Sequence, residues 1–229
     1  GILQVTSASS YGTDTLWNYE VGVRTSWLDN RLTANVVVYY IDWSDIQLRT
    51  FDSDALVQKI QNAGNAEIFG LETEIRYQAT NNLQLSANYA YTDASLTEDF
   101  STVPPAVDAP KGTRLPGSSK DTFSLLADWQ RPVTASLDLQ ANVSYVYVGS
   151  RSANFGSVSG IFAGLPDISS AEEVYLSVGV RHDSGVSASL FANNLLDERN
   201  TQAHFQFNGL DFDAVNTPRT IGLKVSYQF

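Results

Sequence analysis

The acidic and histidine side chains are the residues whose types could perform catalysis. Glu72 and Glu74 occupy alternate positions of one segment, a spacing that could place paired carboxylates on one face for acid and base chemistry. Arg76 follows at the next alternate position, so an internal ion-pair network is the favoured interpretation. His182 and His204 are distant from each other, and neither has a Ser or Cys nucleophile at a motif spacing. These patterns predict no catalytic residues.

Asp197 and Glu198 raise the question of a metal site. They lie in residues 193–200 (NNLLDERN), where their spacing matches no calcium loop. The amides of Asn193 and Asn194 are instead expected to satisfy backbone groups where a strand bends. The sequence therefore predicts no metal site, and it indicates no cofactor.

The elements that position these side chains are predicted to be strands with one apolar and one polar face. Residues 219–229 alternate without a break, so that Leu223 and Val225 flank Lys224 on the opposite face, and the segment ends on Phe229. A tilted transmembrane strand needs about 9 to 11 residues and has this period of two. The segment predicts a membrane strand that ends on an aromatic residue.

Composition excludes several classes of protein. The chain has 229 residues, a net charge of −11 and 43% hydrophobic residues, and no run approaches the roughly 18 apolar residues of a membrane helix. Lys and Arg form no cluster, which argues against nucleic acid as a partner. Without cysteine, no disulfide framework or thiolate metal site can form. No charged and apolar leader opens at Gly1, so we expect a removed signal peptide or a fragment.

The period-two pattern predicts about nine strands, separated alternately by short and long connections. The short connections, rich in turn-forming residues, are 28–31, 79–82, 132–135 and 182–185. The long connections are 52–62, 96–119, 153–171 and 206–216. In outer-membrane barrels the short turns face the periplasm and the long loops face outside, so the C-terminus is predicted to be periplasmic.

The two faces of these strands differ in chemistry. Outward rows carry aromatic residues toward strand ends, which favours an interfacial girdle over the ordinary enrichment of aromatics in strands: Trp17, Trp27, Tyr89, Tyr91, Trp129, Tyr145, Tyr147 and Tyr227. The predicted lumen-facing charged residues are Glu20, Arg24, Glu72, Glu74, Arg76, Asp138, Arg181 and Lys224. In hydrocarbon each basic residue would cost about 2 to 4 kcal/mol, so this face must be wet or packed against protein. A soluble sandwich has the same alternation, but several of these patterns exceed the usual strand length of about 5 to 6 residues.

Four segments, taken together, resemble a known family. They are residues 18–47 (NYEVGVRTSWLDNRLTANVVVYYIDWSDIQ), 62–77 (NAGNAEIFGLETEIRY), 115–129 (LPGSSKDTFSLLADW), and 193–200 (NNLLDERN) followed by 218–229 (PRTIGLKVSYQF). In this order and spacing they resemble the C-terminal half of TonB-dependent outer-membrane receptors. The resemblance implies an all-β, antiparallel transmembrane β-barrel of roughly 22 strands. Residues 1–229 would form about nine C-terminal strands of that barrel without its plug domain.

The resemblance also implies partners and a location. It implies energised uptake of a scarce small-molecule substrate, such as siderophore-bound iron, cobalamin or a saccharide, across the outer membrane of a Gram-negative bacterium. The partners would be outer-membrane lipid, the N-terminal plug and the rest of the barrel, and the TonB complex, which engages a TonB box outside this chain. Tyr227 and Phe229 resemble the C-terminal signal that the barrel-assembly machinery recognises.

Ligand contact is predicted in the long loops, because loops carry recognition on rigid scaffolds. The candidates are Phe100, Arg114, Phe155, Phe162, Phe205 and Phe207. The alternative for these residues is packing against neighbouring loops or the plug. The outer loops are acidic, whereas a receptor for an anionic chelate would offer basic groups, so the substrate stays open.

Two other classes of protein are alternatives to the receptor hypothesis. One is a self-contained small outer-membrane porin or barrel enzyme with eight or ten strands, and the other is a soluble adhesin-like module. The receptor hypothesis predicts no activity for the isolated chain. Two unpaired sheet edges in lipid should make that chain aggregate, because bare backbone groups there cost several kcal/mol each.

Overall fold

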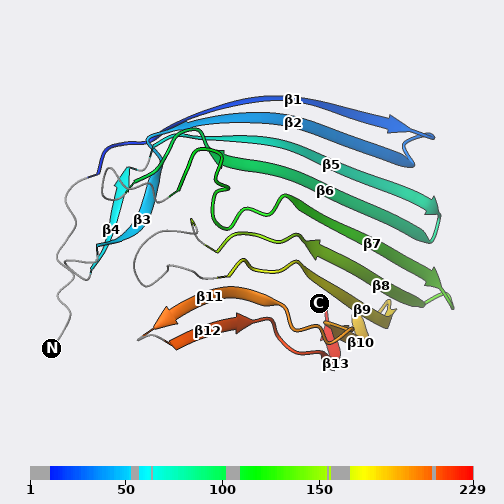
Figure 1. Cartoon of the computed structure of the whole chain (residues 1–229). Helices are drawn as coiled ribbons and strands as arrows, with labels where there is room; N and C mark the ends of the chain where they lie inside the picture. The colour runs from blue at the N-terminus through cyan, green and yellow to red at the C-terminus, as the bar shows by residue number, and fades with distance from the viewer. Residues whose placement is uncertain are drawn as a thin grey trace.

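A computed structural model describes residues 11–52, 57–62, 64–101, 109–153, 155, 166–207 and 210–228, and nearly all of its regular structure is β-strand. In these ranges no helix has the length and apolarity needed to cross a membrane. Within the described residues nine strands form one antiparallel sheet in the order β1-β2-β5-β6-β7-β8-β9-β10-β13 (Figure 1). Their bounds are β1 Thr15–Trp27, β2 Leu32–Ser44, β5 Ala66–Thr80, β6 Leu83–Leu96, β7 Asp121–Pro132, β8 Leu137–Val148, β9 Ala171–His182, β10 Val186–Asn193 and β13 Thr220–Tyr227. The predicted all-β antiparallel fold is confirmed.

The pairing register keeps the two faces of the sheet in phase from strand to strand. Arg24 pairs with Asn35, Asn35 with Glu74, and Glu74 with Asn88, which gives a continuous polar row across four strands. The adjacent row consists of Val23, Val36, Thr73 and Tyr89 on the opposite side. Because side chains alternate along each strand and paired residues share a face, the sheet has one polar face and one apolar face.

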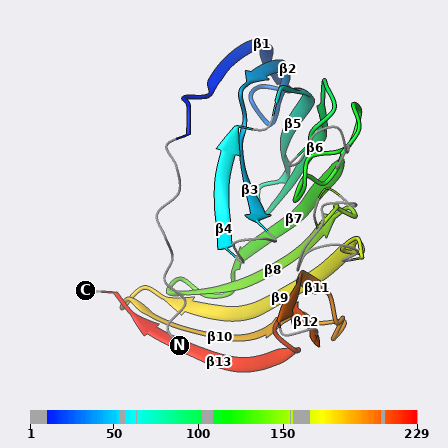
Figure 2. The same cartoon turned by 60° about the vertical axis from the view of Figure 1, so that its left-hand side comes forward.

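The sheet is an open arc. Figure 2 shows it curving from β1 at one edge to β13 at the other, and these two strands do not pair with each other in the described part of the chain. The apolar face is strongly exposed, with 73% of Val21 and 70% of Ile221 accessible. The described strands therefore do not close into the self-contained small barrel that was the alternative.

The two ends of the sheet differ in their connections. At one end, here called the turn end, short connections lie at 28–31, 81–82, 133–136 and 183–185, within a residue or two of the predicted turns. Arg31 ties the first of them to the end of β5, because its Nη2 donates to Gln78 O at 2.9 Å and to Ala79 O at 2.7 Å. The opposite end, called the loop end, carries the longer connections.

Two hairpins leave the sheet at the loop end (Figure 1). They are β3 (Gln47–Asp52) paired with β4 (Val57–Asn62), and β11 (Thr201–Phe207) paired with β12 (Leu210–Val215). β4 and β12 lie within the predicted loops 52–62 and 206–216, while β3 and β11 lie mostly before them, where no strand was predicted, so that part of the prediction was incomplete. Each hairpin forms its own two-stranded sheet rather than extending the main one.

A small apolar core packs the loop end. It consists of Ile46, Ala66, Leu96, Phe100, Ala109 and Phe155, with Trp43 and Leu115 packed against it. Backbone hydrogen bonds hold residues 113–115 against the end of β6, with Leu96 N donating to Thr113 O and Leu115 N to Ala94 O, at 2.9 and 3.0 Å. The loop end is therefore a packed layer rather than a set of independent loops.

Candidate functional site

The polar face gathers the charged residues that the sequence placed on inward rows. Strand pairing and alternation put all eight on this one face: Glu20, Arg24, Glu72, Glu74, Arg76, Asp138, Arg181 and Lys224. That this face lines a lumen stays a prediction. Four hollows, of about 620, 450, 550 and 470 Å³, are lined mainly by residues of this face.

The first concentration of charge spans β1, β2 and β5. Arg76 Nη2 lies 2.6 Å from Glu74 Oε1, and Asn35 Nδ2 donates to Glu74 Oε2 at 3.0 Å. The two carboxylates of the sequence pattern thus differ, since Glu74 is held by a cation and an amide while Glu72 is exposed. The favoured ion-pair interpretation is thus met by the Arg76 and Glu74 pair, to which Asn35 adds a hydrogen bond.

The second concentration lies at the turn end of β7, β8 and β9. Arg181 Nη2 lies 2.9 Å from Asp138 Oδ2, which also accepts from Gln130 Nε2 at 2.8 Å. Asn142 Nδ2 donates to Asp128 Oδ1 nearby. Amide and hydroxyl side chains line the 620 Å³ hollow beside these pairs, including Gln84, Gln140 and Ser189. Such a wall offers neutral donors and acceptors to a polar solute or to water.

The 550 Å³ hollow lies at the loop end and involves a residue that the sequence did not single out. Arg151 lines it with Ser118, Glu173 and Gln202. The backbone of Arg151 forms isolated antiparallel β-bridges with Ser119 and Ile168. Its side-chain Nη2 donates to Gln202 O at 2.9 Å. One backbone carbonyl engages only part of a guanidinium with five N–H donors, so Arg151 can offer others to an anionic group.

The predicted ligand-contacting residues fall into three groups. Phe100 and Phe155 are 4% and 8% exposed, and their ring centroids are 5.9 Å apart in the loop-end core, so both rings pack loops together and present almost no surface to a ligand. Arg114 Nη1 donates to Ser150 O at 3.2 Å and ties two connections together. Phe162 and the side chains of Phe205 and Phe207 lie outside the described residues, as does Phe229.

The loop-end rim of the apolar face repeats one interaction three times. In each case the hydroxyl group of a tyrosine donates a hydrogen bond to a carboxylate on the next strand; the tyrosines are Tyr40, Tyr89 and Tyr145. Each carboxylate lies two residues closer to the loop end than the residue that pairs with the tyrosine. The acceptors are Glu67, Asp121 and Glu172, at 3.1, 2.7 and 2.7 Å. Rings on the apolar face with their hydroxyls directed toward acids match the placement of tyrosine at a water and lipid boundary.

Asp197 and His204 make local contacts within the chain. Asp197 Oδ1 accepts from Arg219 N at 2.9 Å, and this hydrogen bond lowers the pKa of Asp197, with further lowering by the charges of Arg199 and Arg219. His204 Nδ1 lies 2.6 Å from Asp213 Oδ1 across β11 and β12. In the described ranges no three His, Asp or Glu side chains gather in a group that could hold a metal ion.

Comparison with known proteins decides the family. Residues 6–195 match the family described as TonB dependent receptor-like, beta-barrel. The chain belongs to the TonB-dependent receptor family. This receptor chain is 27% identical over 181 residues to the metal-pseudopaline receptor CntO of Pseudomonas aeruginosa, which covers 79% of the chain and 23% of that relative.

Solved structures support the same fold. The ferric yersiniabactin uptake receptor FyuA from Yersinia pestis matches with a TM-score of 0.72 and 18% identity, over 94% of this chain and 30% of that one. The siderophore receptor PiuA from Acinetobacter baumannii matches with a TM-score of 0.68 and 18% identity, over 93% and 28%. The receptor chain thus spans less than a third of the length of these relatives.

Proposed function

We propose that this chain forms part of the wall and the extracellular loops of an outer-membrane receptor that imports a metal chelate. The observation that carries the proposal is the division of one nine-stranded sheet into an exposed apolar face and a charged, hollowed polar face. An apolar face of this extent suits lipid, and the charged face suits a lumen that holds water or a plug domain.

The same division sets the proposed orientation and partners. The turn end would face the periplasm, with the C-terminus, and the loop end would face the outside. The partners would be outer-membrane lipid on the apolar face and a plug domain against the polar face. The TonB complex would act through that plug, and the barrel-assembly machinery would recognise the strand that contains Tyr227.

The substrate class rests on both the relatives and the loop-end hollow. Similar proteins include the metal-pseudopaline receptor, ferric siderophore receptors and a copper transporter. In the hollow, Arg151 offers guanidinium N–H groups beside Glu173 and Gln202, which line the same hollow. Mixed donors and acceptors of this kind suit the carboxylate and amine groups of a metal chelate better than an uncharged saccharide.

The test is uptake of radiolabelled iron, copper or nickel chelates by a Gram-negative strain that carries the full-length gene or lacks it. Each strain is compared with and without a functional TonB protein. We expect accumulation of one metal chelate that requires both the gene and TonB. Accumulation that is equal without TonB, or that extends to small solutes in general, would support a passive pore and contradict the proposal.

Arg151→Ala and Arg114→Ala form a matched pair for the substrate site. Arg151 lines the loop-end hollow, whereas Arg114 bridges two connections outside its lining. We expect Arg151→Ala to weaken chelate binding by about tenfold, because a charge-assisted hydrogen bond contributes roughly 1.5 kcal/mol or more. Arg114→Ala should leave affinity within about twofold. Equal losses in both variants would place the chelate elsewhere.

A further inference from the structure

The register of the last strand is not fixed by its own sequence. On β13 the apolar residues Ile221, Leu223 and Val225 recur at every second position. A slip of two residues would therefore keep apolar side chains on the apolar face. No tight turn fixes the register either, because β10 ends at Asn193 and β13 begins only at Thr220. Another part of the chain must select the observed pairing.

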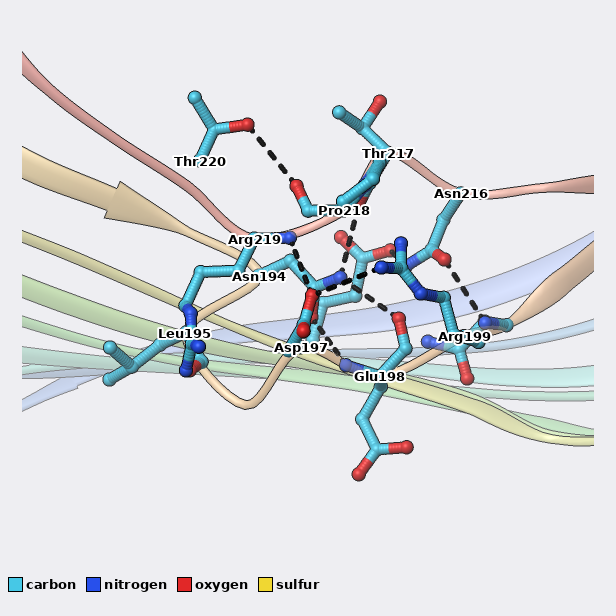
Figure 3. A network of polar contacts seen from close by, with 12 residues as sticks. Asn194, Leu195, Asp197, Glu198, Arg199, Asn216, Thr217, Pro218, Arg219 and Thr220 are labelled. Atoms are coloured by element: carbon cyan, nitrogen blue, oxygen red, sulfur yellow. Dashed lines mark hydrogen bonds and ion pairs between the residues drawn. The ribbon is translucent and has the colours of Figure 1, made fainter.

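A polar network at the loop end joins the end of β10 to the start of β13 (Figure 3). Asn194 is 2% exposed and has a φ of 49°, which turns the chain out of β10. Its Nδ2 donates to Glu198 O at 2.9 Å and to Thr217 O at 3.0 Å, and its Oδ1 accepts from Glu198 N at 3.0 Å. One buried amide thus holds its own turn and the segment that leads into β13.

Asp197 adds a second link between the same segments. Its Oδ1 accepts from the backbone N–H of Arg219, and Arg219 Nη1 donates back to Leu195 O at 3.3 Å. The contacted positions, 217 and 219, immediately precede β13. We call Asn194, Asp197 and Arg219 the clamp. Because both links end on backbone groups at fixed positions, a slip of β13 would break them together.

The middle of the β10 and β13 pair offers an independent reason for the same register. Phe191 lies opposite Gly222 on the polar face, and a Cβ at Gly222 would lie 2.5 Å from Phe191 Cζ. After a two-residue slip this ring would face Thr220 or Lys224 instead of a glycine. Ser187 Oγ and Ser226 Oγ lie 2.7 Å apart across the same pair of strands, so this pair can report the observed register.

We propose that the clamp, with Phe191 seated on Gly222, selects the register in which β13 pairs with β10. The offset between paired strands determines the shear and hence the diameter of a closed barrel. The clamp therefore sets the height at which the free edge of β13 is presented to any strand that pairs with it. This inference depends on the fold and is independent of the transported solute.

Cysteine pairs in the full-length receptor, expressed in an outer membrane, can report the register directly, since this chain contains no cysteine of its own. Ser187→Cys with Ser226→Cys reports the observed register. Ser187→Cys with Lys224→Cys, and Ser189→Cys with Ser226→Cys, report slips of two residues in either direction. The measured quantity is the ratio of slipped to observed crosslinks in the membrane-inserted protein.

Asn194→Ala should raise this ratio by about tenfold, because three part-buried hydrogen bonds to the backbone of Glu198 and Thr217 are lost. Asn193→Ala is the matched control, since it removes the neighbouring amide, which lies outside the clamp, and should leave the ratio unchanged. Asp197→Ala removes one link and should raise the ratio about threefold, and Gly222→Ala should raise it independently. If Asn194→Ala is not inserted, Asp197→Ala decides. An unchanged ratio in Asp197→Ala, or equal ratios in Asn193→Ala and Asn194→Ala, overturns the proposal.

Discussion

The two loop-end hairpins leave the same sheet but are anchored by different physics. At the base of β3 and β4, Ile46, Ala66 and Leu96 are almost fully buried in an apolar core. At the base of β11 and β12, Leu196 is 52% exposed and the buried residue is Asn194. Apolar burial is spread over many contacts, whereas a polar anchor concentrates its stability in a few hydrogen bonds.

Amide side chains occur at both bases, but they are expected to contribute differently to the stability of the two hairpins. Asn62 Nδ2 donates to Asp45 O at 2.7 Å, and Asn65 Oδ1 accepts from Asp45 N at 3.1 Å. These amides lie beside the apolar core and are partly exposed, so water can replace their partners. Asn194 is buried, and water cannot easily replace it. The first hairpin should therefore depend on an apolar residue, and the second on a single amide.

Removing apolar volume should give the largest difference between the two bases. We expect Leu96→Ala to destabilise the folded receptor by about 2 to 5 kcal/mol, because Leu96 is 1% exposed and a cavity would remain. Leu196→Ala, at the second base, should cost about 0.5 kcal/mol or less. Urea unfolding of both variants in detergent, followed by the gel-mobility shift on heating, measures the difference. Equal costs would contradict an apolar anchor at the first base only.

Removing the amides should reverse the ranking. Asn194→Ala is expected to cost about 1 to 3 kcal/mol, since three part-buried hydrogen bonds of the buried amide are lost together. Protease cleavage within β11 and β12 should become faster, while cleavage within β3 and β4 stays unchanged. If cleavage accelerates in both hairpins alike, the bases are coupled rather than independent.

Asn62→Ala should have a smaller effect, of about 0.5 to 1 kcal/mol, confined to the first hairpin. Its links to Gly12 and Asp45 are partly exposed and are supported by Ile46 N donating to Gly64 O at 2.9 Å. The same unfolding assay measures this cost. A loss as large as that of Asn194→Ala would show that the apolar core does not anchor this hairpin.

Acid should weaken the second base selectively, with the smallest effect of the set. The hydrogen bond from Arg219 N lowers the pKa of Asp197, so the charged form stabilises the folded state. That stabilisation is fully present above the ordinary carboxyl pKa of about 4 and is lost as the pH falls through the lower folded-state pKa. Protease cleavage of β11 and β12 should rise below about pH 4 in the wild type. Asp197→Asn should lack this rise.

Period-two reading predicted the strands, the short turns and the shared face of the charged residues, because alternation and turn chemistry are local properties. The β11 and β12 hairpin has a local signal in the sequence, the dipeptide at 208–209 (Asn-Gly) between alternating segments. The role of Asn194 at a strand bend was also predicted. The burial of Phe100 against Phe155 was not, since it depends on two connections meeting in space.

Arg151 could not have been found from the sequence for the same reason. It follows β8 without a motif, and it becomes part of a hollow only because Ser119, from the connection before β7, and Gln202, from β11, come to lie beside it. Long-range loop placement leaves no trace in local spacing. Residue type alone therefore predicts candidate recognition residues, and it does not distinguish an aromatic ring that packs between loops from one that contacts a ligand.

The main sheet has an odd number of strands. The chain therefore enters β1 at the loop end and leaves β13 at the opposite, turn end. Two reporter epitopes, inserted at Gly12 and after Gln228, would therefore sit on opposite sides of any membrane that the sheet crosses. One epitope would be open to antibodies on whole cells, and the other would require permeabilised cells. The hairpins at the loop end do not change this arrangement, because each one brings the chain back to the end of the sheet from which it started.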